Sequence, residues 1–254
     1  MISVGNPNST QPAKSAELAQ QIHLYFGLLD VVDTPHARAA CSDIISPAER
    51  ERADRFLRES DRRQFLLAHG LVRAALSAVA PAVDPAGWQF VTDPHGRPFV
   101  AGPVGAGLLH FSLSHAEGCV ACVISASEAI GVDVEHNGRG AAVREIAGRT
   151  FSPEELEALK GLSPQEQTDR LFDYWTLKEA YIKARGLGLR LPLAQISMNI
   201  VPGQKVTVAF APGFGDEPQR WQFTQMKPSP RHMLAVADGS GKALPVIAQS
   251  WPFR

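Results

Sequence analysis

Cysteine is scarce in this chain, with 3 among 254 residues. Three cysteines cannot form a disulfide framework. The stability of the fold must therefore come from a packed core. Cys119 and Cys122 have the spacing of a redox or zinc motif, but they lie in an apolar run that we interpret as a strand. Residues three apart on a strand face opposite ways, and no second cysteine pair exists. We therefore expect buried thiols in a reducing cytoplasm.

An excess of charge of one sign is also missing, because 25 Lys and Arg stand against 26 Asp and Glu, for a net charge of −1. No global field would recruit nucleic acid or anionic lipid. No apolar run approaches the length of a membrane span. The polar start of the chain lacks the basic-then-apolar order of a signal peptide. We expect a cytoplasmic protein without nucleic-acid or membrane partners, in which any phosphate binding is local.

Two carboxylates stand on one short apolar segment, Ile130-Gly131-Val132-Asp133-Val134-Glu135. In a strand, Asp133 and Glu135 point to the same face, about 7 Å apart at the backbone. Two such carboxylates repel each other unless a cation lies between them. Oxygen ligands of this kind suit Mg²⁺ held through carboxylates and substrate phosphates.

A helix is predicted downstream, because Ser163-Pro164-Gln165-Glu166 has capping-box spacing with proline at the first helical position. Gly186 is its expected end. On this helix Glu179 falls inside an apolar stripe, with Lys183 one turn on at the edge. A carboxylate on an apolar face requires a partner, since an unpaired buried charge is costly. A metal ion shared with the two strand carboxylates would supply one.

Each of these features alone has an ordinary explanation. An Asp-x-Glu strand is usually the solvated face of an amphipathic strand, and a Glu-to-Lys step of four residues is usually a surface helix pair. A third segment strengthens the case. His110-Phe111-Ser112-Leu113-Ser114-His115 ends an alternating run, and Arg97 precedes it. Serine and histidine at a strand end can donate hydrogen bonds to a phosphate, and arginine adds bidentate charge.

Five motifs in this order resemble the phosphopantetheinyl transferases, and more narrowly their larger, surfactin-synthetase type of bacterial secondary metabolism. The resemblance runs from about Ser46 to Ser197 and continues more weakly to about Val236. The motifs are Gly96-Arg97-Pro98, Phe111-Ser112-Leu113-Ser114-His115, Gly131-Val132-Asp133-Val134-Glu135, Phe151-Ser152-Pro153-Glu154-Glu155 and Trp175-Thr176-Leu177-Lys178-Glu179-Ala180-Tyr181-Ile182-Lys183.

The order of expected elements, helices grouped with antiparallel strands, predicts an α+β fold. The resemblance implies two similar lobes related by a pseudo-twofold, with coenzyme A in the cleft between them. We place a disordered lead-in at 1–19, an N-terminal lobe at 20–128, a C-terminal lobe with the metal and catalytic motifs at 129–245, and a C-terminal tail at 246–254.

The activity implied by the resemblance is transfer of the 4'-phosphopantetheine arm of coenzyme A to a serine of an apo acyl, peptidyl or aryl carrier protein. Adenosine 3',5'-bisphosphate leaves, Mg²⁺ is required, and the enzyme is expected to be a monomer. The resemblance implies metal binding by Asp133, Glu135 and Glu179, and catalysis by Glu179, Lys183 and Asp133. Glu179 would either bind the metal or accept the serine proton, whereas Lys183 would hold the pyrophosphate.

Seven residues are expected around the coenzyme: Arg52, Arg73, Arg97, Ser114, His115, Lys178 and Lys183. The sequence departs from the family pattern where Glu49 replaces a basic residue and Phe65 replaces a small hydroxyl residue. We therefore expect Arg52 or Arg62 to serve the 3'-phosphate. Two other functions are compatible with parts of the pattern: an inactive coenzyme-A or carrier-binding protein, and a Mg²⁺-dependent pyrophosphohydrolase acting on a nucleotide.

Overall fold

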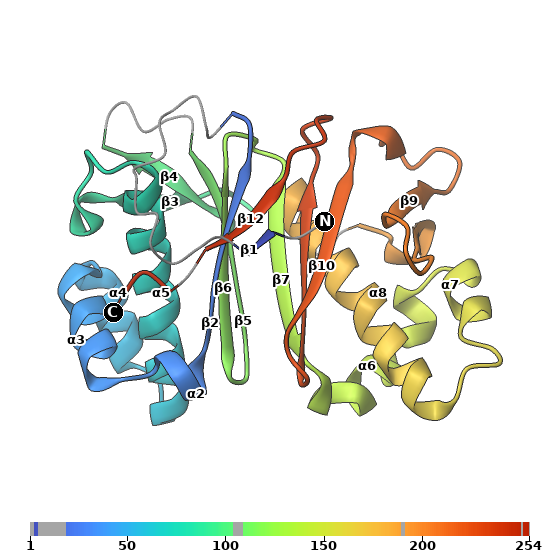
Figure 1. Ribbon diagram of the computed structural model, residues 1–254, viewed down its shortest axis with the longest axis horizontal. Helices are drawn as coiled ribbons and strands as arrows, with labels where there is room; N and C mark the ends of the chain where they lie inside the picture. Colours follow the sequence, from blue (N-terminus) through green and yellow to red (C-terminus); the bar gives the residue numbers. More distant parts are fainter. Residues whose placement is uncertain (1–2, 5–18, 104–108, 189–190, 250, 254) are drawn as a thin grey trace. The chain divides into compact units, whose positions relative to one another are not determined.

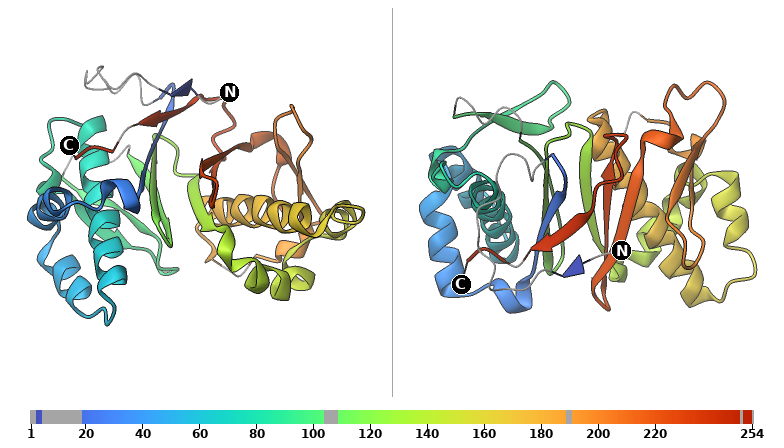
Figure 2. Two further views of the ribbon diagram at one scale, coloured as in Figure 1. Left: turned by 60° about the horizontal axis from the view of Figure 1, so that its bottom comes forward. Right: turned by 45° about the horizontal axis from the view of Figure 1, so that its top comes forward.

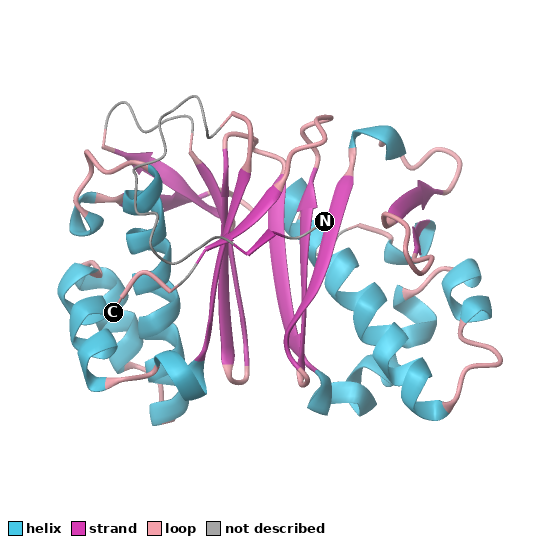
Figure 3. Cartoon of the chain, viewed as in Figure 1, coloured by secondary structure: helices cyan, strands magenta, loops and turns pink. Residues whose placement is uncertain are grey.

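The structure of the protein is a computed structural model that describes residues 3–4, 19–103, 109–188, 191–249 and 251–253. The chain forms two compact units. Unit 1 comprises Met1–Glu128 with Leu244–Arg254, and unit 2 comprises Ala129–Ala243. Both combine helices with mainly antiparallel strands (Figure 3), so the fold class is α+β, as predicted. The pseudo-twofold and the coenzyme cleft stay predictions.

Unit 1 is built on a five-stranded sheet in the order β1-β12-β2-β6-β5. Its strands are β1 (Ser3–Val4), β2 (Ile22–Leu28), β5 (His110–Ala116), β6 (Cys119–Ser125) and β12 (Val246–Gln249), and a separate hairpin pairs β3 (Gln89–Thr92) with β4 (Pro98–Gly102). Strand β12 pairs in parallel with β2, so residues 246–249 of the expected C-terminal tail belong to this sheet. Of the expected lead-in at 1–19, residues 1–2 and 5–18 lie outside the described residues.

The helices of unit 1 gather on one face of this sheet (Figure 1). They are α2 (Leu29–Val32), α3 (Pro35–Ile44), α4 (Pro47–Asp54) and α5 (Glu59–Val79). Ser46 and Glu49 form a complete capping box at the start of α4. The apolar face of α5 packs against β6 and β5, which buries Val72 and Leu76 in the core of this unit.

Unit 2 has a three-stranded antiparallel sheet in the order β10-β11-β7, crossed by the long helix α8 (Figure 2). Its strands are β7 (Ile130–His136), β8 (Ile196–Asn199), β9 (Thr207–Phe210), β10 (Gln222–Ser229) and β11 (His232–Asp238), and its helices are α6 (Gly140–Thr150), α7 (Pro153–Ala158) and α8 (Pro164–Arg185). Helix α8 packs against β7 and β11, and α6 packs against α8. The core of unit 2 includes Phe172, Tyr181 and Trp221.

All three cysteines are free and buried, as predicted. Burial raises the pKa of the Cys41 and Cys119 thiols to about 12, which keeps them protonated and unreactive. Among the described residues, no helix is long and apolar enough to cross a membrane.

Candidate active site

Strand β7 presents Gly131, Asp133 and Glu135 to helix α8. At Gly131 the helix backbone comes so close that an added Cβ would lie 2.1 Å from the carbonyl oxygen of Ala180 and 2.6 Å from the amide nitrogen of Ala184. No other residue type fits there without moving the helix. Glycine at this position therefore sets how closely α8 lies over the two carboxylates that follow on the same face.

Helix α8 forms where its end signals predict. Ser163 and Glu166 complete a capping box, and Gly186 ends the helix in the left-handed conformation at φ 65°. Trp175, Glu179 and Lys183 are spaced four residues apart, so they share one side of the helix. The local sequence thus places three polar groups in register above β7.

Two direct bonds join the helix to the strand carboxylates. Lys183 Nζ lies 2.7 Å from Asp133 Oδ1, and Trp175 Nε1 donates to Glu135 Oε1 at 2.9 Å. Asp133 is buried, whereas Glu135 and Lys183 are half-buried. The indole hydrogen bond fixes the orientation of the Glu135 carboxylate, a contact that the sequence did not reveal.

Glu179 lies in the field of both strand carboxylates. Burial, and then the charge of Asp133, raise the pKa of Glu179 to about 7; Lys183 opposes this rise and Glu135 adds to it. The half-buried carboxyl predicted from the apolar stripe is therefore present. Three carboxylates that interact in this way concentrate negative charge beside Lys183.

The expected magnesium ion requires oxygen ligands that converge on one point. No group of three His, Cys, Asp or Glu side chains within the described residues could hold a metal ion as it stands. Metal binding by Asp133, Glu135 and Glu179 therefore stays a prediction. Magnesium is usually held by one or two carboxylates completed by substrate phosphates and water. Asp133 and Glu135 fit that second arrangement.

Lys178 does not contact a ligand site, which corrects its assignment to the coenzyme. Its side chain is 0% exposed and its ammonium lies 2.5 Å from Glu155 Oε2. It also donates to the carbonyl oxygens of Thr150 at 2.8 Å and Leu193 at 2.9 Å. The three donors of the ammonium are thereby used inside unit 2.

Unit 1 contains a cavity of about 690 Å³ with a largely aromatic and aliphatic wall. Of the seven residues expected around the coenzyme, Arg52, Arg73 and His115 line it. Its apolar lining residues include Phe65, Val72, Trp88, Phe90, Phe111 and Leu113. A space of this size with flat apolar walls and a few polar groups is typical of a site for a nucleotide-sized ligand.

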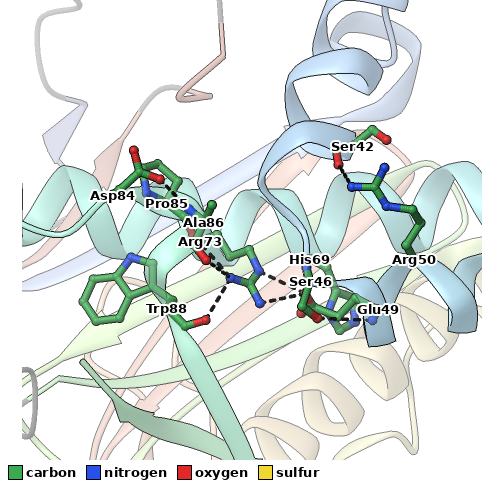
Figure 4. A network of polar contacts seen from close by, with 10 residues as sticks. All are labelled: Ser42, Ser46, Glu49, Arg50, His69, Arg73, Asp84, Pro85, Ala86 and Trp88. Carbon is green, nitrogen blue, oxygen red and sulfur yellow. Dashed lines mark hydrogen bonds and ion pairs between the residues drawn. The ribbon is translucent and has the colours of Figure 1, made fainter. Parts of the chain in front are cut away.

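Arg73 is the most deeply buried of the lining cations, and Figure 4 shows its polar contacts. Its guanidinium forms an ion pair with Glu49 Oε2 at 2.7 Å and donates to the carbonyl oxygen of Trp88 at 2.9 Å. Glu49 also accepts from Ser46 N and contacts His69 Nδ1 at 2.9 Å. Arg73 thus stabilises the wall of the cavity. Glu49, which stands where the family has a basic residue, is neutralised by its neighbours.

Arg52 is the better placed of the two arginines expected at the 3'-phosphate. It lines the cavity, and its guanidinium carbon lies 5.3 Å from the centroid of the Phe65 ring. Arg62 is not among the lining residues of the cavity and forms an ion pair with Asp54 at 2.7 Å. Phe65, which replaces a small hydroxyl residue, therefore supports Arg52 with its ring.

Two other expected residues do not line the cavity. Phe111, Leu113 and His115 line it from alternate positions of β5, so Ser114 points to the opposite face of that strand, where it is buried. Arg97 donates to the carbonyl oxygen of Glu128 at 2.7 Å. Their assignment to the coenzyme stays a prediction.

Replacing Glu49 by glutamine should destabilise the protein in a pH-dependent way. Burial alone would raise the pKa of Glu49. Hydrogen bonds from His69 and Ser46 and the charge of Arg73 outweigh burial and lower this pKa from 4.5 to about 2. A depressed carboxyl pKa stabilises the fold above pH 4.5, and the effect disappears as the pH falls toward 2. We expect Glu49→Gln to cost roughly 3 kcal/mol at pH 7. Urea unfolding of both proteins at pH 7 and pH 3 is the measurement, and an equal difference at both pH values would contradict the assignment.

Comparison with known proteins identifies the family. A model of the 4'-phosphopantetheinyl transferase superfamily matches residues 129–237. The chain is 33% identical over 169 residues to a 4'-phosphopantetheinyl transferase of Bacillus subtilis, covering 66% of this chain and 72% of the relative. It is 34% identical over 164 residues to the 4'-phosphopantetheinyl transferase Sfp of Bacillus subtilis, covering 65% and 70%.

A further relative spans nearly the whole chain. The 4'-phosphopantetheinyl transferase HetI of Nostoc sp. is 28% identical over 227 residues, covering 89% of this chain and 91% of the relative. A match of that length takes in residues of both units. The chain therefore belongs to the 4'-phosphopantetheinyl transferase superfamily, as its motifs predict.

Proposed function

We propose that the transferase reaction of this chain is carried out by the α8–β7 carboxylate cluster, defined as Asp133, Glu135, Glu179 and Lys183. The observation that supports this most directly is that α8 places Lys183 Nζ 2.7 Å from Asp133 Oδ1 and Trp175 Nε1 2.9 Å from Glu135 Oε1. Glu179 lies between these two helix residues in the sequence, and burial and the charge of Asp133 raise its pKa. In a site that concentrates negative charge, repulsion is relieved most when a cation binds together with the phosphate ligand. Magnesium held by Asp133 and Glu135 would neutralise charge on the reacting phosphates.

The bonds that form and break during the transfer indicate separate roles for Glu179 and Lys183. The serine oxygen of the carrier forms a bond to the phosphorus that carries the pantetheine arm, and the bond from that phosphorus to adenosine 3',5'-bisphosphate breaks. Glu179 accepts the serine proton, as a carboxylate can when the hydroxyl lies within hydrogen-bond reach. Lys183, now paired with Asp133 at 2.7 Å, turns its ammonium to the pyrophosphate and stabilises the departing bisphosphate.

The nucleotide end of coenzyme A is proposed to occupy the cavity of unit 1. The ring would contact the aromatic wall that includes Phe90 and Phe111, and Arg52 and His115 would face the phosphates. Aromatic walls suit a nucleobase because stacking is favourable for a flat ring. Arg52 remains able to bind an anion, since no described carboxylate forms an ion pair with it.

Arg52→Ala should therefore weaken coenzyme binding by about tenfold to a hundredfold, the effect of one lost charge-assisted hydrogen bond. Arg62→Ala is the matched control, because Arg62 is paired with Asp54 and is not a lining residue. Calorimetric titration with coenzyme A measures both. Equal affinity in wild type and Arg52→Ala would argue against this cavity.

One assay separates the proposed activity from its alternatives. The protein is incubated with coenzyme A, magnesium and an apo carrier protein, and the masses of the intact carrier and of the coenzyme products are both read. Transfer adds one phosphopantetheine to the carrier. A pyrophosphohydrolase would release phosphopantetheine to water and leave the carrier unchanged. An inactive binding protein would leave both the carrier and coenzyme A unchanged.

A further inference from the structure

His115 can serve the cavity of unit 1 in two tautomers, and only one is useful to an anion. In neutral imidazole one ring nitrogen carries the proton and the other is an acceptor. A phosphate oxygen can accept a hydrogen bond from the nitrogen that carries the proton. The lone pair of the other nitrogen repels it. The tautomer is set by whatever the second nitrogen contacts. The neighbours of His115 therefore decide what the imidazole offers to a ligand.

Gln64 supplies that contact from helix α5. Its amide Nε2 lies 2.8 Å from His115 Nδ1, although the two residues are 51 positions apart in the sequence. An amide NH₂ can only donate, so in this arrangement Nδ1 is the acceptor and the ring proton resides on Nε2. The next residue on α5, Phe65, lines the cavity and contacts Arg52. The start of α5 thus supports both cavity residues, Arg52 and His115, that the proposed function assigns to phosphate.

We propose that Gln64 is a positioning residue for coenzyme binding, which holds His115 with its proton on Nε2. This inference rests on the proposed function, because it assumes that the nucleotide end of coenzyme A occupies the cavity. Gln64 acts through His115 and makes no step of the transfer itself. Removal of Gln64 removes the hydrogen bond that favours this tautomer, so a fraction of the molecules offers the wrong nitrogen.

Gln64→Leu should weaken binding of adenosine 3',5'-bisphosphate by about threefold to tenfold, the effect of one neutral hydrogen bond. The Michaelis constant for coenzyme A should rise by the same factor, and kcat at saturating coenzyme should stay unchanged. Gln165→Leu is the matched control, since Gln165 is an exposed helical glutamine of unit 2 that bonds Asp169. The control should bind as wild type.

Two further measurements test the role through His115. Nitrogen NMR of the His115 ring at pH 8 should show the proton on Nε2 in wild type, a mixture in Gln64→Leu, and the proton on Nδ1 in Gln64→Glu, where a carboxylate accepts instead of donating. In a His115→Ala background, Gln64→Leu should cause no further loss of affinity.

The outcomes distinguish this inference from the proposed function. If His115→Ala or Arg52→Ala binds the bisphosphate as wild type does, the proposed occupant of the cavity is wrong and the inference falls with it. If those variants lose affinity but Gln64→Leu does not, only the role of Gln64 is wrong. That role is equally wrong if Gln64→Leu costs as much affinity without His115 as with it.

Discussion

Glu179→Gln should lower turnover by about two orders of magnitude or more, with a much smaller change in coenzyme-A affinity. The substitution keeps the size of the side chain and removes its charge and its basicity. Glu179 lies on the face of α8 that carries Trp175 and Lys183, and burial and Asp133 raise its pKa to about 7. No other described carboxylate combines this position on α8 with so large a rise.

The stability of the same variant should change in the opposite direction. A carboxyl whose folded pKa lies above its unfolded value of 4.5 destabilises the fold as the pH rises from 4.5 to about 7. Glu179→Gln should therefore raise the thermal midpoint at pH 8 in metal-free buffer. Glu157→Gln, at an exposed pair with Lys160, is the control. Normal turnover in Glu179→Gln together with a raised midpoint would refute the catalytic role.

Lys178→Met should destabilise the protein strongly, by about 3–5 kcal/mol. It leaves the Glu155 carboxylate buried without its cation, and Glu155 is 1% exposed. Burial raises the pKa of Glu155 and lowers that of Lys178, each against the charge of the other. Glu155 also accepts from the backbone of Ser152 and Met198, so the damage should reach α7 and β8.

Lys183→Met gives the contrasting result. Its side chain is 29% exposed but that of its partner Asp133 is 6% exposed, so we expect a smaller cost than for Lys178→Met, about 1–2 kcal/mol, together with loss of transfer. Urea unfolding measures both stabilities, and the double variant Glu155→Leu/Lys178→Met should recover much of the loss. A Lys178→Met protein as stable as wild type but weak in coenzyme binding would restore the coenzyme role that the structure removes.

Helix ends were the most predictable part of the fold. Ser-Pro-x-Glu at Ser46, Ser152 and Ser163 starts α4, α7 and α8, because the cap and the proline act locally. Helix α3 begins with the related Thr34-Pro35 signal and was missed, although Thr34 accepts from Ala37 N. The pairing of β12 with β2 joins segments more than two hundred residues apart. No local pattern encodes such a contact.

The capping glutamates have a second role that the sequence did not reveal. Glu49 caps α4 and pairs with Arg73 on α5, and Glu155 caps α7 and pairs with Lys178 on α8. Each unit thus links a capping box to a basic residue on its long helix. This ion pair recurs in both units, and only the packing could reveal it.

Helical rotation explains why two lysines of one motif differ. Five residues separate Lys178 from Lys183, about 140° around the helix after one full turn. Lys183 therefore faces Asp133 on β7, and Lys178 faces Glu155 in the interior. The sequence identified the acids and the lysine of the cluster, because a strand and a helix fix which side chains share a face. It could not decide which partner each charge takes.

The most direct test of the carboxylate cluster is the intact mass of an apo carrier protein after incubation with coenzyme A. Wild type, Asp133→Asn, and wild type with excess EDTA are compared, with coenzyme-A affinity measured on the same preparations. We predict that wild type with magnesium adds one phosphopantetheine per carrier, and that the other two samples add almost none while the variant stays folded. Full modification by Asp133→Asn, or by wild type in excess EDTA, would contradict the account.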